Sequence, residues 1–408
     1  MCVRGGEAMK HIHILKNPIQ KYAWGSRTAL QSLLDWPKPW EEPAAELWMG
    51  VHPKGPSNVQ MDGRWRSLIE VVTADPVSVL GSDAAVQFSN KLPFLFKVLA
   101  ADRPLSIQVH PHMKQARDGF KRENLNHIPL DAPNRNYKDA CHKPECLCAV
   151  TRFEAMKGFR APEEILKLMD RVFSKAPPEV FDPLREGQES AALMRFFTSL
   201  MSMDPVRKAQ VVNDAVKGAE GIAGEDRSFH WLLELNREYP GDVGVLSPLF
   251  LNLVDLSPGE AIYVPAGELH AYLSGVGMEI MASSDNVLRG GLTPKHIDIP
   301  ELLNIVNFTA NPVLKQKPPA DDNFERVYKT PAIEFQLSEI ALNGHERFVS
   351  RRERSVEILI CMTGEGRVEE LGGGRSLPLK KGMSIIVPSA VPGYAVSGHI
   401  SLYKGGVK

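Results

Sequence analysis

The sequence has few cysteines, no long apolar run and almost no net charge, and each absence excludes a class of protein. Its five cysteines are odd in number and scattered over 408 residues, which argues against a disulfide framework and favours a reducing compartment. No stretch of about 18 apolar residues occurs, so no transmembrane helix is expected. A formal net charge of −1 gives no basic surface for nucleic acid or anionic membranes. The opening MCVRGGEAMKHIHI lacks the apolar core of a signal peptide, so we expect a cytoplasmic protein.

The pattern of the chain predicts a mainly β protein with an α-helical insertion. Short apolar strands separated by Pro and Gly turns fill residues 10–158 and return from residue 240 onward. Between them, residues 159–239 repeat a helical period. In APEEILKLMDRVF, for example, a Pro and two acidic residues precede apolar residues at Ile165, Leu166, Met169 and Val172.

An internal repeat indicates what the β regions build. The stretches LSPGEAIYVPAGELHAY and LKKGMSIIVPSAVPGY share a turn glycine, a strand valine and the proline after it, at Gly259 and Gly382, Val264 and Val387, and Pro265 and Pro388. This pattern is typical of a jelly-roll barrel of the cupin kind. We therefore predict two cupin-like jelly-roll barrels and a helical domain: residues 10–158 with 240–310 as a metal-binding barrel, 159–239 as the helical domain, and 311–408 as a C-terminal barrel without metal.

Candidate metal ligands lie in the stretch LSIQVHPH, residues 105–112. Gln108 and His110 are two residues apart on a predicted strand, so their side chains share a face. A lone histidine on a strand is more often structural than a ligand, and further ligands are needed. His270 is a further candidate ligand. In the internal repeat it aligns with Gly393 of the second copy. A position that holds His in one copy and Gly in the other is not needed for the barrel itself.

A third segment, HKPECLCAV, adds a carboxylate and two cysteines. On the predicted strand Glu145 faces one side, while Cys146 and Cys148 face the other. A thiolate metal site is conceivable from the CxC spacing, but packing is the favoured role for both cysteines. His142, Lys143 and Glu145 crowd three ionisable groups into four residues, which a solvated loop would also explain but which favours a site.

Gln108, His110, Glu145 and His270 then form one candidate set. Two imidazoles with oxygen ligands and no thiolate favour zinc or a similar divalent ion, and we expect one ion per chain. Lys97 is a charged residue inside the apolar strand KLPFLFKVLA. Its amine either reaches solvent at a strand end or contacts an anion, and the sequence leaves both possibilities open.

The chain resembles the type I phosphomannose isomerases. The resembling stretches, in family order, are YAWGS, AELWMGVHPK, LPFLFKVLAADRPLSIQVHP, RNYKDACHKPE, PAGELHAYLSG and SDNVLRGGLTPKHIDIPELL, followed by the C-terminal barrel. Cys141, where relatives often have Asn, is a local departure. The resemblance implies zinc-dependent interconversion of mannose 6-phosphate and fructose 6-phosphate through a cis-enediol. It also implies the zinc ligands Gln108, His110, Glu145 and His270.

This chemistry suggests further roles. Removing a carbon-bound proton needs a positioned base, for which Lys143 and Glu279 compete. His142 is a candidate for ring opening. Arg289 could hold the enediolate or the phosphate, with Asp285 orienting it. Three further pocket residues are expected to contact the substrate: Lys97, Ser106 and Trp24.

Two other functions remain open from the residues alone. A metal-dependent cupin oxygenase would use similar ligands but would usually lack cations such as Lys143 and Arg289. A sugar-binding regulator would keep the barrel without needing a base. We expect an enzyme that acts on a small phosphosugar as a monomer, with no nucleic-acid or membrane partner.

Overall fold

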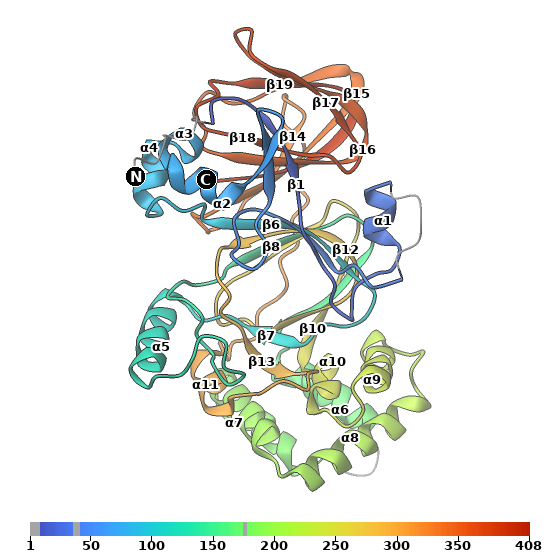
Figure 1. Ribbon diagram of the computed structural model, residues 1–408. Coiled ribbons are helices and arrows are strands. Elements are labelled where there is room, and N and C mark those ends of the chain that lie inside the picture. Colours follow the sequence, from blue (N-terminus) through green and yellow to red (C-terminus); the bar gives the residue numbers. More distant parts are fainter. Residues whose placement is uncertain (1–8, 36–40, 174–177) are drawn as a thin grey trace.

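The computed structural model describes residues 9–35, 41–173 and 178–408. Figure 1 shows three parts stacked along the molecule: the C-terminal strands at the top, a second β region in the middle, and the helical insertion at the bottom. The predicted fold class, mainly β with a helical insertion, is confirmed. No helix in the described ranges is both long and apolar enough to span a membrane.

The upper sheet joins the two ends of the chain. In the described residues it has nine strands, in the order β14-β15-β19-β16-β18-β1-β4-β5 with β17 beside β16. Their bounds are β1 His13–Lys16, β4 Asn58–Met61, β5 Arg64–Ser67, β14 Glu325–Tyr328, β15 Gln336–Val349, β16 Glu357–Glu370, β17 Ser376–Lys380, β18 Ser384–Val387 and β19 Tyr394–Gly406.

The N-terminal strands of this sheet, which belong to the part of the chain assigned by sequence to the metal-binding barrel, pair with strands of the C-terminal region. Strand β1 pairs with β18, placing His13 opposite Ile386, and β4 and β5 extend the sheet beyond it. The physical reason is burial, because Ile12 packs into an apolar cluster formed by residues of the C-terminal strands.

The central sheet carries the candidate site. Its ten strands in the described residues are β2 Ile19–Gln20, β3 Glu46–Met49, β6 Phe94–Ala101, β7 Ile107–Val109, β8 Glu145–Ala149, β9 Phe153–Phe159, β10 Leu251–Leu256, β11 Ala261–Val264, β12 His270–Ala282 and β13 Leu288–Gly291. The long strand β12 pairs with β6, β7, β8 and β9. Segments distant in sequence therefore meet along one strand.

The internal repeat is visible in the structure. The equivalent strands β11 and β18 have four residues each, and a turn glycine with positive φ precedes each of them, Gly259 at 79° and Gly382 at 81°. Glycine adopts this backbone conformation without the steric cost that a Cβ would bring. Each strand is followed by a strand of 13 residues, β12 or β19.

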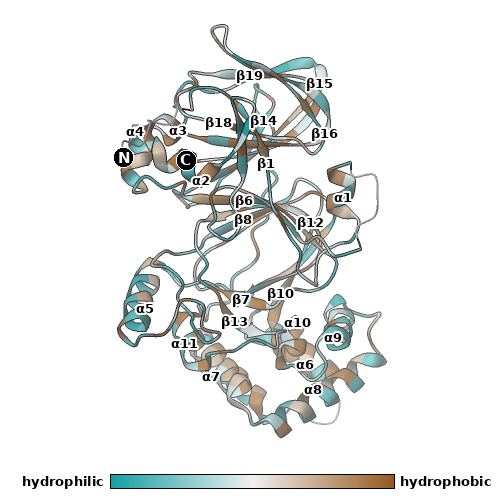
Figure 2. Ribbon diagram, viewed as in Figure 1, coloured by the Kyte–Doolittle hydropathy of each residue, from teal (hydrophilic) through white to brown (hydrophobic). Residues whose placement is uncertain are grey.

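The helical insertion contains α6 Pro162–Val172, η1 Glu179–Arg185, α7 Glu189–Ser202, α8 Pro205–Glu220, α9 Arg227–Glu238, η2 Val243–Leu246 and α10 Ser247–Phe250. Helix α6 begins as predicted, with Pro162 in the first turn and Ile165 and Met169 buried. Aromatic contacts such as Phe159 with Phe197 join the insertion to β9. Figure 2 shows hydrophobic residues of these helices in brown, and the buried ones form a single apolar cluster.

Shorter helices surround the sheets: α1 Ala29–Leu33, α2 Leu68–Ala74, α3 Pro76–Leu80, α4 Ser82–Gln87, α5 Met113–Leu125 and α11 Ile299–Ile305. Helix α5 begins just after the stretch that contains Gln108 and His110. His112 caps it by accepting a hydrogen bond from the backbone N–H of Gln115. The cap ends the extended segment directly after the candidate ligands.

Candidate active site

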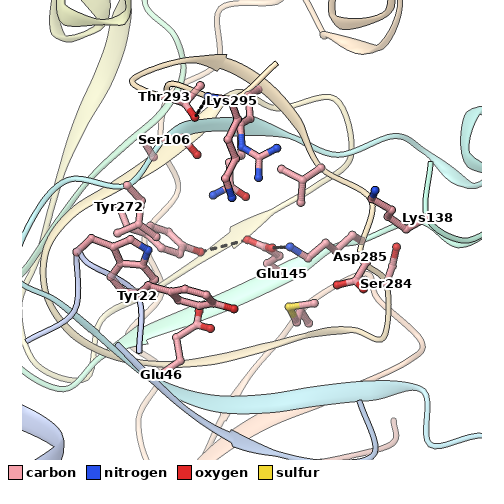
Figure 3. Close-up of a pocket in the computed structure, with 18 of the residues that line it drawn as sticks. Tyr22, Glu46, Ser106, Lys138, Glu145, Tyr272, Ser284, Asp285, Thr293 and Lys295 are labelled. Atoms are coloured by element: carbon pink, nitrogen blue, oxygen red, sulfur yellow. Dashed lines mark hydrogen bonds and ion pairs between the residues drawn. The ribbon is translucent and has the colours of Figure 1, made fainter. Parts of the chain in front are cut away.

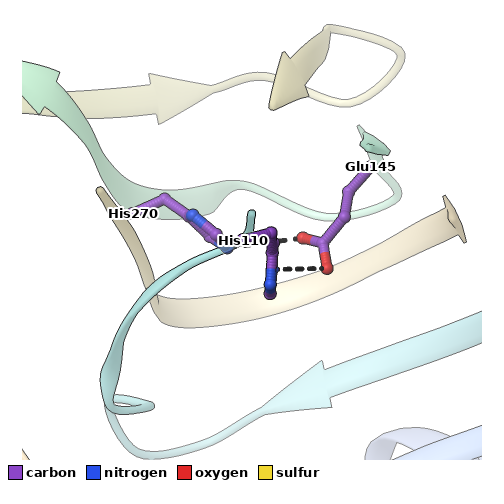
Figure 4. A group of neighbouring side chains, drawn as sticks. All are labelled: His110, Glu145 and His270. Atoms are coloured by element: carbon purple, nitrogen blue, oxygen red, sulfur yellow. Dashed lines mark ion pairs between the residues drawn. The ribbon is translucent and has the colours of Figure 1, made fainter. Parts of the chain in front are cut away.

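Three of the predicted metal ligands meet in the interior of the central β region. His110 follows β7, Glu145 opens β8 and His270 opens β12, and all three side chains are buried. His110 Nε2 lies 3.1 Å from Glu145 Oε1, and His270 Nε2 lies 3.4 Å from Glu145 Oε2. One ligand atom from each residue lies within 4.8 Å of the others (Figure 4). The arrangement is that of a compact metal-ligand group.

The hydrogen bonds of the two imidazoles fix which nitrogen faces Glu145. His110 Nδ1 lies 2.8 Å from the carbonyl oxygen of Asn286, and His270 Nδ1 lies 3.0 Å from that of Glu268. A carbonyl only accepts, so each Nδ1 carries a proton, and the Nε2 of each ring is the nitrogen left to act as a ligand. Such carbonyl partners commonly orient metal-bound histidines.

The protonation states also suit a cation. Burial, followed by the nearby Lys143 ammonium, lowers the pKa of His110 to about 4, so the ring is neutral at pH 7. Burial would raise the pKa of Glu145, but Lys143 and His110 hold it well below its usual value. His110 Nε2 is buried and makes no hydrogen bond within the described residues. A buried free lone pair, a second imidazole and a carboxylate fit a divalent metal ion.

Gln108, the fourth predicted ligand, lies beside this group. It stands opposite His270 in the β7–β12 pairing and opposite Arg289 in the β7–β13 pairing. Directly opposed residues on neighbouring strands share a face of the sheet. Gln108 also lines the pocket described next, so its position is consistent with a ligand.

A polar pocket of about 780 Å³ opens onto these ligands (Figure 3). Most of the predicted site residues line it: Trp24, Lys97, Ser106, Gln108, Lys143, Glu145, His270, Glu279, Asp285 and Arg289. Within the described ranges, no lining residue comes after His296. The pocket therefore belongs to the central β region and the loops around it.

Lys97 is neither at a strand end nor free for an anion. Its side chain is 8% exposed, and its amine lies 2.8 Å from Glu279 Oε2 and 3.2 Å from Glu46 Oε1. Burial lowers the pKa of Lys97, but Glu279 and Glu46 outweigh it and raise the pKa overall. Glu46, which also accepts a hydrogen bond from Trp48 Nε1 at 2.7 Å, was missed in the sequence. An acidic residue between the apolar residues Ala45 and Leu47 could have indicated that Glu46 has a buried partner.

A tyrosine links this ion pair to the metal ligands. The Tyr272 hydroxyl lies 2.9 Å from Glu279 Oε1 and 3.3 Å from Glu145 Oε2, and Figure 3 shows it beside Glu145. Burial raises the pKa of Glu279 despite the opposing effect of Lys97. Tyr272 was missed in the sequence, although it lies two residues after His270 and so shares its face of β12.

Two of the predicted roles do not match the contacts. Asp285 pairs with His52 Nε2 at 3.2 Å and Lys54 Nζ at 2.9 Å. Burial would raise the pKa of Asp285, but these two contacts lower it overall. Arg289, which Asp285 was expected to orient, has no ion-pair or hydrogen-bond partner in the described residues. His142 is not among the described lining residues and pairs with Glu334 instead. That geometry gives no support for His142 in ring opening.

The described cysteines include two that pack in the core behind Glu145. Cys141, Cys146, Cys148 and Cys361 are all free, while Cys2 lies outside the described part of the chain. Cys146 and Cys148 pack in one apolar cluster, whereas Leu147 packs in another on the opposite face. Burial raises the pKa of Cys148 to about 11, so it is an unreactive thiol at neutral pH.

Together, the buried His–Glu–His group, the polar pocket above it and the β architecture define a metal-dependent enzyme of the cupin type. Residues 12–162 match the catalytic domain of phosphomannose isomerase type I, residues 168–251 its helical insertion domain, and residues 327–404 the cupin domain of mannose-6-phosphate isomerase. The chain belongs to the type I phosphomannose isomerase family.

Individual relatives cover nearly the whole chain. It is 41% identical over 389 residues to mannose-6-phosphate isomerase of Escherichia coli strain K12, covering 94% of this chain and 97% of that one. The Homo sapiens enzyme of that name is 33% identical, over 83% and 84% of the two chains. A mutant phosphomannose isomerase from Salmonella typhimurium superposes with a TM-score of 0.90 at 38% identity, over 97% and 99%. A zinc-bound mannose 6-phosphate isomerase gives 0.88 at 37%, with the same coverage.

Proposed function

We propose that this chain interconverts mannose 6-phosphate and fructose 6-phosphate through a cis-enediol, with one zinc ion per chain. The observation that carries the proposal is a buried His–Glu–His group open to a pocket that also contains an unpaired arginine. The names of the relatives support the substrate, and the zinc-bound relative supports the metal.

Gln108, His110, Glu145 and His270 would hold the zinc ion. When bound, zinc would act as a Lewis acid and favour negative charge on the substrate oxygens. The neutral His110 imidazole and the ionised Glu145 carboxylate are already in the protonation states that ligation requires. The carbonyls of Asn286 and Glu268 orient the two rings from behind.

The substrate phosphate would bind at the cationic side of the pocket. Arg289 and Lys295 line it, and no carboxylate among the described residues pairs with either. Burial, then the nearby Arg289 and Lys54 charges, lower the pKa of Lys295, as expected where cations gather. Ser106 lines the same pocket as Thr293 and Lys295 and can donate a hydroxyl hydrogen bond (Figure 3). A dianion would relieve the mutual repulsion of these cations.

The contacts favour Lys143 over Glu279 as the group that moves the proton between carbons 1 and 2. Both oxygens of Glu279 are engaged, one by Lys97 and one by Tyr272. Lys143 lines the pocket, 2.9 Å from a metal-ligand oxygen of Glu145. In its neutral form the amine would take the proton from carbon 2 and return it to carbon 1, while the hydroxyl proton on carbon 2 moves to the oxygen of carbon 1. Arg289, on the same face as Gln108, would stabilise the enediolate.

We also propose that the enzyme is a cytoplasmic monomer. The pocket is complete within a single chain, so a second copy is not needed to build the site. The free cysteines of the described residues suit a reducing compartment. Light scattering during size-exclusion chromatography measures the mass directly.

A coupled assay that follows fructose 6-phosphate formed from mannose 6-phosphate tests the function. Turnover should disappear after chelator treatment and return with one equivalent of zinc. Oxygen consumption without isomerisation would instead indicate a cupin oxygenase. Binding of the phosphosugar without turnover would indicate a sugar-binding regulator, and either result would overturn the proposal.

A further inference from the structure

His142 and Lys143 are neighbours in the segment before β8, but their side chains go to different places. Lys143 lines the pocket, where its amine lies 2.9 Å from Glu145 Oε1. His142 Nε2 lies 2.6 Å from Glu334 Oε1. Lys143 directly precedes Pro144, which biases its backbone toward the extended region, where successive side chains point in opposite directions. A contact that holds His142 therefore limits how the backbone that carries Lys143 can turn.

Glu334 is well placed to act as that restraint. It lies between β14 and β15 in the C-terminal region and is 8% exposed. Burial would raise the pKa of its carboxyl, but the hydrogen bond from His142 and its charge lower the pKa overall, so Glu334 is an anion at neutral pH. Its second oxygen accepts a hydrogen bond from the Ile333 backbone N–H at 3.2 Å, which limits rotation of the side chain.

The C-terminal segment that contains Glu334 shares an apolar cluster with the back face of the strand that contains Glu145. Ala332 and Phe335 are buried in the same apolar cluster as Cys146 and Cys148, which form the back face of β8. The C-terminal barrel thus supports β8 from the side opposite the pocket. It contributes no lining residue among those described.

Backbone hydrogen bonds anchor the segment on either side of His142 and Lys143. The Cys141 carbonyl accepts from Asn286 Nδ2 at 2.8 Å, and the Pro144 carbonyl accepts from the Ala282 N–H at 3.1 Å. Between these anchors, the backbone groups of His142 and Lys143 make no hydrogen bond within the described residues. The contact with Glu334 is therefore the restraint on this two-residue span from outside the pocket.

We propose that Glu334 is a positioning residue for the isomerase reaction. Through His142 it orients the Lys143 amine in the pocket and so couples the C-terminal barrel to catalysis. The inference rests on the proposed function, with Lys143 as the group that moves the proton. It gives the C-terminal barrel a role in turnover although the barrel supplies no pocket residue.

Steady-state kinetics on the zinc-loaded full chain tests this role. Glu334→Ala should lower kcat by about 10- to 100-fold, since small misplacements of a reacting group cost this much, while KM and zinc content stay near the parent values. Glu334→Gln keeps an oxygen that accepts from His142 and should remain within about threefold of the parent. Glu334→Leu, which conserves volume, replaces the alanine variant if that one does not fold.

Glu339→Ala is the matched control. It breaks an ion pair with Arg326 in the same C-terminal region and leaves the contact between His142 and Glu334 intact. Its kcat should equal the parent value even where its melting temperature falls. A double variant with His142→Ala and Glu334→Ala should be no slower than the slower single variant, because both remove one interaction.

The outcomes separate this inference from the proposed function. If the parent protein does not isomerise mannose 6-phosphate, the proposed function fails first. If the parent is active and Glu334→Ala retains its full kcat, Glu334 is only structural and the inference fails alone. Equal losses in the alanine, glutamine and Glu339 variants would also overturn it, because the effect would then be a general loss of stability.

Discussion

The buried ion triad around Lys97 provides a sharp test of the site's energetics. Lys97→Met keeps the apolar stem but removes the ammonium that lies between Glu279 and Glu46. Both carboxylates have side chains at most 8% exposed, so water cannot replace the lost partner. Breaking a buried pair from one side costs about 3–5 kcal/mol, because a charge is left uncompensated. We expect a loss of this size in the free energy of unfolding.

The loss should depend on pH with a defined sign. Burial already raises the pKa of Glu279, and Lys97 opposes that effect, so the substitution raises the pKa further. A group with a raised folded-state pKa contributes stability at low pH that is lost as pH rises above its unfolded value of about 4.3. The variant should therefore lose more stability at pH 8 than at pH 5.5, by about 1.4 kcal/mol for each unit of additional pKa shift.

Urea unfolding of the parent and the variant, both saturated with zinc, measures the difference at each pH. Adding Glu279→Gln to Lys97→Met should recover about 0.5–3 kcal/mol, the usual range of coupling between contacting residues. The reasoning is refuted if Lys97→Met costs less than about 1 kcal/mol at pH 8 or if the second substitution adds to the loss. A cost that shrinks as pH rises would contradict the assigned direction of the Glu279 pKa.

Three further predictions concern the metal and the transition state. His270→Ala should lose bound zinc, and elemental analysis that still finds one ion per chain would count heavily against the ligand set. Replacing Cys146 and Cys148 together by Ala should keep the zinc and cost about 1–3 kcal/mol of stability, measured by urea unfolding, because both pack in the core. Arg289→Lys should lower kcat by more than about tenfold with zinc retained, since an ammonium cannot hold two oxygens as the planar guanidinium does; a rise in KM alone would place Arg289 at the phosphate instead.

Local geometry explains why much of the site could be predicted. The two-residue period of a strand placed Glu145 on the face opposite Cys146 and Cys148, and these two cysteines pack on the far side of β8. The repeated glycine turns at Gly259 and Gly382 likewise follow from the backbone conformation that each turn requires. Such features depend on a few consecutive residues, so the sequence contains them completely.

The charge pairing was decided by the tertiary structure. Lys97 and Glu46 are 51 residues apart, and His142 and Glu334 are 192 residues apart. A charged residue in an apolar strand indicates that it needs an oppositely charged or hydrogen-bonding partner in the low-dielectric interior. Its sequence does not identify that partner, because the partner comes from whichever segment lies alongside in the fold. For the same reason, the pairing of β1 with β18 could not be read from either segment alone. The sequence by itself determined which side chains share a face, whereas the folded structure decided which distant groups neutralise one another there.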